Sequence, residues 1–289
     1  MPKLRFFYSK VRLHWGFTVR VKGATAAQPA LVLPPPTTVV GAFAYPLARL
    51  LGLREEPPSS KKGAKRPVIT DVFECFLKAT RGASAGLDPM SPTGLSSYME
   101  TTRIMGFVYK TGGQVNKALK EPIYKSIPLI MPVQPLGATY SPGGVVHIGA
   151  LIDVEDLARC LRVGVGDVED AAVKACHGVS RLGSKEGVVS VLEAAYGEPE
   201  AVEGDFYTLG YVPASMVSKR VPELVVSVYL YDLDYNLAEY YVAAGWRISS
   251  QNILTPPPGL VGKLYSTNPG FKAFYLKEHE ELKVVAGVK

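Results

Sequence analysis

The chain has 289 residues, 47% of them apolar, with a net charge of +6 and an isoelectric point near 9.0. This composition excludes a disordered chain and allows either one large domain or two ordinary ones. The positive charge is compatible with a polyanionic partner and equally with a solvated basic surface. The sequence has no run of about eighteen apolar residues and no signal-peptide pattern, so we expect a cytoplasmic protein without membrane contact.

The first predicted element is a strand or hairpin from about Leu4 to Lys22, because apolar residues alternate there with polar or basic ones. His14 and Trp15 lie side by side in it. An indole that stacks on a base and a histidine that hydrogen-bonds to it would form a nucleic-acid contact. A buried tryptophan beside a satisfied histidine is the competing interpretation.

A proline-rich turn follows, in the sequence LPPPTTVVGAFAYPLARLLG from Leu33 to Gly52. The prolines fix the approach to a helix that we expect to begin near Pro36 or Thr37 and to end at the glycine. Thr37 and Thr38 place hydroxyl groups where a helix needs caps, and a helix N-terminus is a binding site for anions. The rest of this helix is apolar on nearly every side, which predicts that it belongs to the core.

A polar loop rich in proline and lysine, Glu55–Lys65, comes next. We then expect a strand from Val68 to Ala79, since Val, Ile, Phe and Thr dominate it, although Asp71–Lys78 would tolerate a helix.

The segment between Gly82 and Gly144 predicts a long inserted arm, because glycine, proline and serine interrupt each apolar run. Within it, Ile127–Pro132 and Val145–Asp153 are predicted to pair as strands around the tip GATYSPGG. Several basic residues lie in the arm, among them Arg103 and Lys110.

Helical patterns begin at Asp153, which is predicted to cap a helix through Arg162, and Asp167 is predicted to cap a second helix through about Cys176. A strand is expected at Val188–Ala195. From Phe206 onward strands predominate, notably at Leu224–Leu233, Ala238–Ala244 and Phe271–Leu276.

The first two hundred residues therefore predict the order β-α-β-β-α-β, an α+β chain with the ferredoxin-like arrangement of RNA recognition folds. The open sheet of that fold is a platform for single-stranded nucleic acid. We expect one domain at residues 1–205, with the arm at 82–144, and a β-rich domain at 206–289.

The loop HGVSRLGSKEG, from His177 to Gly187, is the second candidate site. Its glycines let backbone amides approach a ligand, and it supplies hydroxyl groups and positive charge, as a phosphate site requires. It is not a P-loop, because serine precedes lysine where that motif has the reverse order. A glycine-rich turn with solvated charges is the alternative. The candidate binding residues are His177, Ser180, Arg181, Gly183, Ser184 and Lys185.

Neither a metal nor a cofactor is expected. The histidines lie far apart without paired metal-ligand spacing: His14, His147, His177 and His279. The cysteines are odd in number and too scattered for a C-x-x-C site, so we expect small buried hydrophobes in a reducing compartment: Cys75, Cys160 and Cys176. A ribonuclease-like site with His177 as general base, beside Lys185 and a tyrosine, stays open.

Together, the basic first strand, the proline-threonine turn and the later SRLGSKEGVVSV resemble archaeal CRISPR-associated proteins of the fifth Cas family, in the type I-A subgroup. The family motif is a proline-rich turn with Ser or Thr that opens a small-residue helix, here Pro34–Gly41. The subgroup adds an R-[LI]-G-S-K-E loop, here Arg181–Glu186. The chain after Phe206 is matched only by its β-rich character.

The resemblance implies a RAMP-superfamily fold and a non-catalytic subunit of a Cascade interference complex, which binds the repeat-derived 5′ handle of crRNA and uses its arm as a thumb. The implied RNA contacts are the two threonines at the helix start, the glycine-rich loop, stacking on Tyr8 and Trp15, and backbone contacts from Arg103 and Lys110. The implied partners are family-seven backbone subunits and the large subunit, with the small subunit and the helicase-nuclease as further neighbours and target DNA as an indirect partner.

Two other functions stay open. One is a metal-independent endoribonuclease that processes precursor crRNA, as a type I-C relative does. The other is an unrelated enzyme with the same fold that binds a small anion or a nucleotide.

Overall fold

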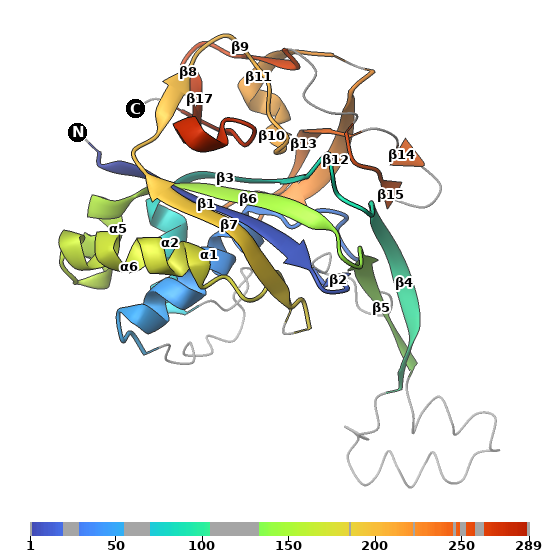
Figure 1. Ribbon diagram of the computed structural model, residues 1–289, viewed down its shortest axis with the longest axis horizontal. Helices are drawn as coiled ribbons and strands as arrows, with labels where there is room; N and C mark the ends of the chain where they lie inside the picture. Colours follow the sequence, from blue (N-terminus) through green and yellow to red (C-terminus); the bar gives the residue numbers. More distant parts are fainter. Residues whose placement is uncertain are drawn as a thin grey trace, which may run out of the picture.

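The computed structural model describes residues 2–19, 29–54, 70–104, 133–184, 186–221, 223–244, 247–248, 253–257 and 263–287. Its centre is an antiparallel sheet in the order β3-β6-β1-β7. The strands are β1 (Leu4–Leu13), β3 (Thr80–Leu87), β6 (Val145–Asp153) and β7 (Val189–Gly197). Helices cover one face of this sheet (Figure 1): α1 (Pro36–Leu50), α2 (Asp71–Ala79), α5 (Val154–Leu161) and α6 (Val165–His177).

Helix α1 begins where the proline-rich turn predicts, and Gly52 follows its last turn with φ +65°. Its start differs from the prediction in one respect. The N-cap residue is Pro35, and no side chain caps the helix. Its carbonyl accepts hydrogen bonds from the amides of Thr38 and Val39, at 2.8 and 3.1 Å. The threonine hydroxyls therefore lie within the first turn instead of capping it.

The expected strand at Val68–Ala79 is wrong, and the alternative of a helix at Asp71–Lys78 is confirmed, because the described part of this segment forms helix α2. The hydroxyl of Thr70 caps the helix by accepting a hydrogen bond from the amide of Phe73 at 3.2 Å. Three residues of one helical face, Cys75, Phe76 and Ala79, are buried. This cap and the burial of one face outweigh the β-propensity of the segment.

The prediction of three unpaired cysteines is also wrong. Cys75 on α2 and Cys160 on α5 form a disulfide that closes a separation of 85 residues. Only Cys176 has a free thiol; it is buried, and burial raises its pKa to about 12. The sequence hides this pairing because the two helices come together only in the folded chain.

The later helices confirm the predicted pattern. Asp153 caps α5 by accepting hydrogen bonds from the amides of Glu155 and Asp156, at 3.2 and 3.3 Å. The second expected cap, Asp167, lies in the first turn of α6, whose N-cap residue is Gly164. None of the helices in the described part of the chain is long and apolar enough to cross a bilayer.

The C-terminal segment is built of short strands, and those at the predicted positions 224–233, 238–244 and 271–276 are confirmed. Its strands are β8 (Glu200–Val202), β9 (Asp205–Phe206), β10 (Val212–Pro213), β11 (Val217–Arg220), β12 (Val225–Tyr231), β13 (Leu237–Ala243), β14 (Arg247–Ile248), β15 (Ile253–Leu254), β16 (Tyr265–Thr267), β17 (Phe271–Tyr275) and β18 (Val284–Gly287). They form small sheets in the orders β10-β13-β12, β11-β16-β9 and β18-β17-β8.

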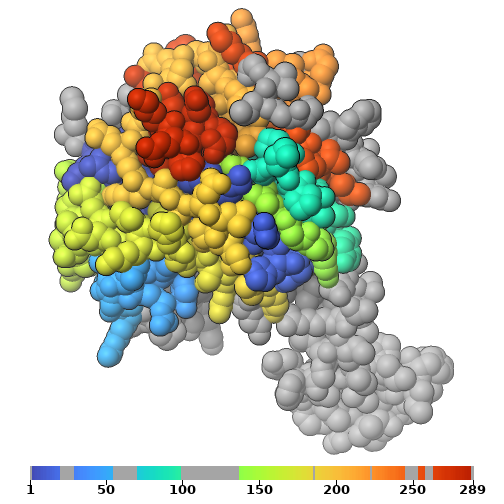
Figure 2. Space-filling view, in the orientation of Figure 1, coloured from blue at the N-terminus to red at the C-terminus, as the bar shows by residue number. Residues whose placement is uncertain are grey.

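These strands cover the face of the central sheet that the helices leave free (Figure 1). In the space-filling view the C-terminal residues, orange and red, lie on the opposite side of the molecule from α1, in light blue (Figure 2). Phe6 and Tyr8 of β1 are buried in one cluster with Phe274, Leu282 and Val284. The C-terminal segment lies close to the central sheet because several positions of the sheet are glycine. A Cβ at Gly149 would lie 2.8 Å from Leu282, and a Cβ at Gly86 would lie 2.1 Å from the Leu209 carbonyl oxygen. The expected open platform for nucleic acid is therefore wrong, since both faces of the sheet are covered.

The predicted arm contains a ribbon of two antiparallel strands, β4 (Leu95–Ile104) and β5 (Val133–Tyr140). It projects from the body in Figure 1, and β2 (Gly16–Phe17) and β15 flank its root. The predicted pairing is wrong in two ways. Strand β6 pairs with β1 and β3 in the central sheet, and β3 itself comes from the segment assigned to the arm. The expected strand at residues 127–132 lies outside the described residues.

Two hydroxyl groups anchor the root of this ribbon to the segment that leads into α1. Ser97 of β4 donates to the carbonyl of Ala30 at 2.9 Å, and Thr139 of β5 donates to the carbonyl of Leu31 at 2.8 Å. Both hydroxyls come from buried residues on the inner face of the ribbon.

Candidate functional site

The proline-threonine turn and the glycine-rich loop lie on opposite walls of one cavity. Its volume is about 550 Å³, within the usual range for ligand sites. One wall is helix α1, and the other is the loop that follows α6; Thr18 and Val19, which follow β2, also line the cavity. The predicted hairpin at Leu4–Lys22 does not form, because β1 pairs with β6 and β7 whereas β2 pairs with β5. The lining residues are Thr18, Val19, Thr38, Gly41, Ala42, Tyr45, Ser180, Arg181, Gly183 and Ser184.

The loop wall is held by backbone contacts to Thr18, the residue that follows β2. Gly183 forms a parallel bridge with Thr18, and the amide of Ser184 donates to the Thr18 carbonyl at 3.1 Å. Gly183 has φ +79°, and a Cβ there would lie 2.7 Å from the Thr18 oxygen. This position therefore requires glycine both for its conformation and for its close approach.

The polar groups of this wall suit an anion. Arg181 is exposed and brings a guanidinium group, which pairs well with phosphate oxygens. The Oγ of Ser184 is buried and has no hydrogen-bond partner among the described residues. A buried hydroxyl group without a partner is costly, and a ligand oxygen would satisfy it. Ser180 adds a second hydroxyl group in an exposed residue.

The helix wall is one face of α1, because Thr38, Gly41, Ala42 and Tyr45 recur at helical spacing. Tyr45 leaves 43% of its surface exposed, so its ring is available for contact. Thr37 does not line the cavity and is 7% exposed, so we withdraw it from the candidate contacts. The cavity thus combines an apolar wall, suited to a base or a sugar, with a wall of hydroxyl groups and one positive charge.

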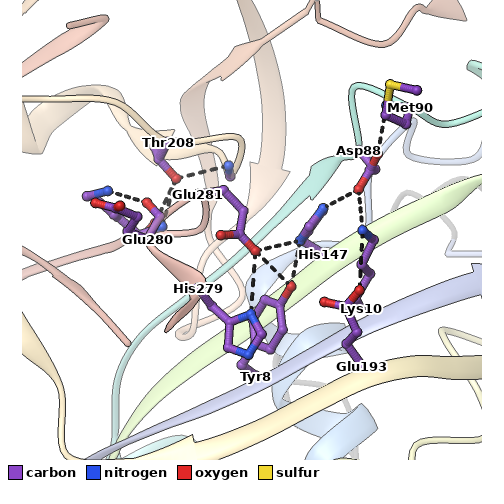
Figure 3. Close-up of polar contacts among 12 residues, drawn as sticks. Tyr8, Lys10, Asp88, Met90, His147, Glu193, Thr208, His279, Glu280 and Glu281 are labelled. Carbon is purple, nitrogen blue, oxygen red and sulfur yellow. Dashed lines mark hydrogen bonds and ion pairs between the residues drawn. The ribbon is translucent and has the colours of Figure 1, made fainter. Parts of the chain in front are cut away.

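Tyr8 does not line this cavity. It is fully buried between the central sheet and the C-terminal segment (Figure 3). Its hydroxyl donates to Glu281 at 3.0 Å and lies 2.9 Å from Nδ1 of His147. Its ring stacks on His279 with the centroids 4.0 Å apart. Burial, together with Glu281, raises the tyrosine pKa far above its ordinary value. A base cannot reach this ring, so Tyr8 is also withdrawn.

The same network continues to Asp88, which sequence reasoning did not identify. Nε2 of His147 donates to its carboxylate at 2.8 Å, and Lys10 pairs with it at 2.9 Å. The hydrogen bond from His147, with help from Lys10, holds the pKa of Asp88 well below its usual range. No linear spacing signals this cluster, because its members come from β1, β6, the end of β3 and the C-terminal turn. It fastens the C-terminal segment to the sheet.

His14 and Trp15 lie at the bend between β1 and β2, beside the glycine-rich loop. Nε2 of His14 lies 2.7 Å from the Ser190 hydroxyl, and the indole N–H of Trp15 donates to the Glu186 carbonyl. His14 is exposed and Trp15 is half-buried. Neither residue lines the cavity, but both remain at the surface.

The remaining sequence candidates are dispersed. His177 is exposed at the last turn of α6 and does not line the cavity. The backbone of Arg103 lies in β4, opposite Gln134. Lys110 and Lys185 lie outside the described residues. Sequence reasoning missed five lining residues: Thr18, Val19, Gly41, Ala42 and Tyr45.

A metal site does not form within the described ranges, where no group of three or more His, Cys, Asp or Glu residues gathers around a common point.

Comparisons with known proteins show what the chain is similar to in sequence and in fold. No protein-family model matches the chain. Two curated proteins of Saccharolobus solfataricus match it over 211 residues, which is 71% of each chain: "CRISPR system aCascade subunit Cas5 1", at 28% identity, and "CRISPR-associated protein Cas5 3", at 26%. The crystal structure of a CRISPR protein from Archaeoglobus fulgidus aligns with 99% of this chain and 100% of its own, with a TM-score of 0.53 and 16% identity.

The solved structure establishes likeness of fold, namely a mixed α/β chain with several antiparallel sheets. The curated proteins establish likeness of sequence over most of the chain. The resemblance to the fifth Cas family that the two motifs indicate is therefore confirmed, since the chain has archaeal homologues that carry the Cas5 name.

Proposed function

We propose that this protein is a subunit of a CRISPR RNA-guided interference complex and that its cavity between α1 and the glycine-rich loop binds the repeat-derived 5′ handle of crRNA. The observation that carries the proposal is the convergence of the two sequence motifs on one cavity, although Thr38 and Arg181 lie far apart in the chain. One homologue is named as a subunit of the archaeal Cascade complex.

The chemistry of the two walls supports RNA as the ligand. A nucleotide carries a phosphate, a polar sugar and a flat apolar base. Arg181 and the hydroxyl of Ser184 match the phosphate, while Ala42, Val19 and the exposed ring of Tyr45 match the sugar and base. The phosphate contacts would supply most of the affinity and make binding depend on salt.

We propose a non-catalytic role in a complex of type I-A. The R-L-G-S-K-E loop supports that subgroup. The described lining of the cavity includes no histidine. His147 is buried with both ring nitrogens at hydrogen-bond distance from neighbours, so it is poorly placed as a general base.

We further propose a ferredoxin-like RAMP unit at residues 1–205 and a second unit at 206–289. The element order β1, α1 and α2, β3, β6, α5 and α6, β7, together with the sheet order β3-β6-β1-β7, supports this assignment. The proposed partners are crRNA, family-seven backbone subunits and the large subunit, and the proposed location is the cytoplasm.

The test is binding of the purified full chain to RNA that carries the repeat sequence of its own CRISPR array. Arg181→Ala combined with Lys185→Ala should weaken binding and reduce the slope of affinity against salt concentration, since two phosphate contacts are lost. Arg159→Ala is the matched control, because this exposed arginine of α5 does not line the cavity. An unchanged salt slope in the double variant would remove the loop from the RNA site.

The same RNA tests the endoribonuclease alternative. Incubation with wild-type protein in EDTA should leave the RNA intact. Specific cleavage that disappears in the His177→Ala variant would overturn the non-catalytic assignment.

A further inference from the structure

Three aromatic side chains form a continuous cluster at the root of the arm, outside the cavity. Trp15 lies against Tyr140 with the ring centroids 5.1 Å apart, and Tyr140 stacks on Tyr98 at 4.3 Å with an angle of 18° between the rings. We name these three residues the aromatic cluster. They come from the β1–β2 bend, from β5 and from β4, so only the folded chain brings them together.

Strand register explains why the rings share one face. Ser96 lies opposite Tyr140, and Tyr98 lies opposite Ala138, so both tyrosines point to the same side of the ribbon. The intervening residues, Ser97 and Thr139, point to the other side and are buried. The aromatic side of the ribbon therefore faces outward, and Tyr98 leaves 45% of its surface exposed.

The cluster is continuous with the cavity through a single loop. The indole N–H of Trp15 donates to the Glu186 carbonyl of the loop, and Gly183, three residues earlier in the same loop, bridges Thr18 in the cavity lining. A strand of nucleic acid that leaves the cavity along this loop meets Trp15 first and then the two tyrosines. His14, next to Trp15 in the chain, is exposed, and the loop itself carries both Arg181 and the exposed Glu186.

We propose that the aromatic cluster is a base-stacking site for the single-stranded RNA that the cavity binds. Tyr98 and Tyr140 are stacked, whereas Trp15 is tilted at 59° to Tyr140 and is held by its hydrogen bond to Glu186. Every base has a flat face that can extend such a stack. The inference rests on the proposed function and adds to it a second contact, which recognises bases through their flat faces where the cavity loop recognises phosphate.

The test measures binding of the full chain to a uridine oligonucleotide and to a matched oligonucleotide in which abasic sugars replace the bases. Tyr98→Ala should weaken binding of the uridine RNA at least about 5-fold and leave the salt slope and the abasic affinity unchanged. Tyr98→Phe should bind like wild type, since it keeps the ring. Tyr229→Ala is the matched control, because this tyrosine of β12 is 61% exposed and lies outside the cluster.

Fluorescence gives a second readout. The chain has two tryptophans, so Trp246→Phe leaves Trp15 as the only indole. Uridine RNA should quench its emission, and the abasic oligonucleotide should not. If Tyr98→Ala binds both oligonucleotides like wild type and Trp15 is not quenched, the stacking site is wrong while the cavity proposal stands. If wild-type protein binds neither uridine RNA nor repeat RNA, the proposed function fails, and the stacking site fails with it.

Discussion

Gly183 and Thr18 form a parallel bridge that joins the glycine-rich loop to the residue that follows β2, and both residues line the cavity. The bridge exists because the loop residue has no side chain. A Cβ at this position would lie 2.7 Å from the Thr18 carbonyl oxygen and 2.9 Å from the side chain of Val19.

Gly183→Ala should therefore displace the loop and weaken RNA binding. The control is Gly270→Ala, which has a similar φ of +86° but no atom within 4 Å of the new Cβ. Both variants bear the cost of a left-handed backbone, about 1–2 kcal/mol. The collision should lower the free energy of unfolding of Gly183→Ala by about 1–3 kcal/mol more. Urea unfolding measures the loss of stability, and RNA binding measures the loss of affinity. If Gly183→Ala and Gly270→Ala lose equal amounts of both, the close contact between Gly183 and Thr18 is contradicted.

The disulfide between α2 and α5 predicts a redox-dependent stability. Cys160→Ser should lower the free energy of unfolding by about 2–4 kcal/mol, since a bond across 85 residues strongly restricts the unfolded chain. Dithiothreitol should lower the wild-type melting temperature and leave that of Cys160→Ser unchanged. Mass spectrometry after alkylation should find one reactive thiol in the unfolded, non-reduced chain, at Cys176, and three after reduction. Three thiols without reductant would show that the bond is absent.

The buried network predicts a loss of stability in acid. The pKa of Asp88 is lower in the folded chain than its ordinary value of 3.8, chiefly because of the hydrogen bond from His147. A carboxylate with a lowered pKa stabilises the fold fully above its unfolded pKa, and this contribution is lost as the pH falls below about 4 towards the folded value.

Asp88→Asn should accordingly unfold more easily than wild type at pH 7, and its free energy of unfolding should change less between pH 4 and pH 2. Glu198→Gln, at an exposed carboxylate, should keep the wild-type pH dependence. Urea unfolding at each pH gives the comparison. Parallel curves for Asp88→Asn and wild type would show that this carboxylate does not cause the acid sensitivity.

Alanine substitutions at two glycines of the central sheet should destabilise the packing of the C-terminal segment to different extents. A Cβ at Gly86 would meet the backbone of Leu209 at 2.1 Å, whereas one at Gly149 would meet the Leu282 side chain at 2.8 Å. A side chain can move more easily than a backbone. Gly86→Ala should therefore destabilise by about 3 kcal/mol or more, and Gly149→Ala by about 1–3 kcal/mol.

Combining Leu282→Ala with each glycine substitution gives two double-mutant cycles, which measure whether the added methyl group collides with Leu282. Combined with Gly149→Ala, Leu282→Ala should cost less than the sum of the two single changes by about 0.5–3 kcal/mol, because it removes the colliding atoms. The same combination with Gly86→Ala should show no such gain. Additive losses in both pairs would contradict the packing of Leu282 on the sheet.

Local pattern predicted much of the fold. Helix α1, the cap at Asp153 and strand β6 lie where the sequence places them, because a proline-rich turn, a capping aspartate and a short apolar run act over a few residues. Helix α2 was given only as the alternative to a strand, because the β-branched residues Val68, Ile69 and Thr70 directly precede it and favour a strand. The partners of β6 were missed because strand pairing is a long-range property.

The cavity was half predicted. Both motifs that line it are visible in the sequence, and Tyr45 could have been found, since it lies on the same helical face as Thr38. Tyr8 shows the limit of this reasoning. Alternation assigns it to one face of a strand, but the segment that covers that face comes from the far end of the chain.

The hydrogen bonds at the root of the arm give the molecule a mechanical property. Ser97 and Thr139 attach the ribbon to the carbonyls of Ala30 and Leu31, a few residues before α1. The ribbon therefore acts as a lever whose fulcrum is the segment that leads into the cavity wall. A force applied to the arm would therefore also act on the segment that enters α1, which forms one wall of the cavity.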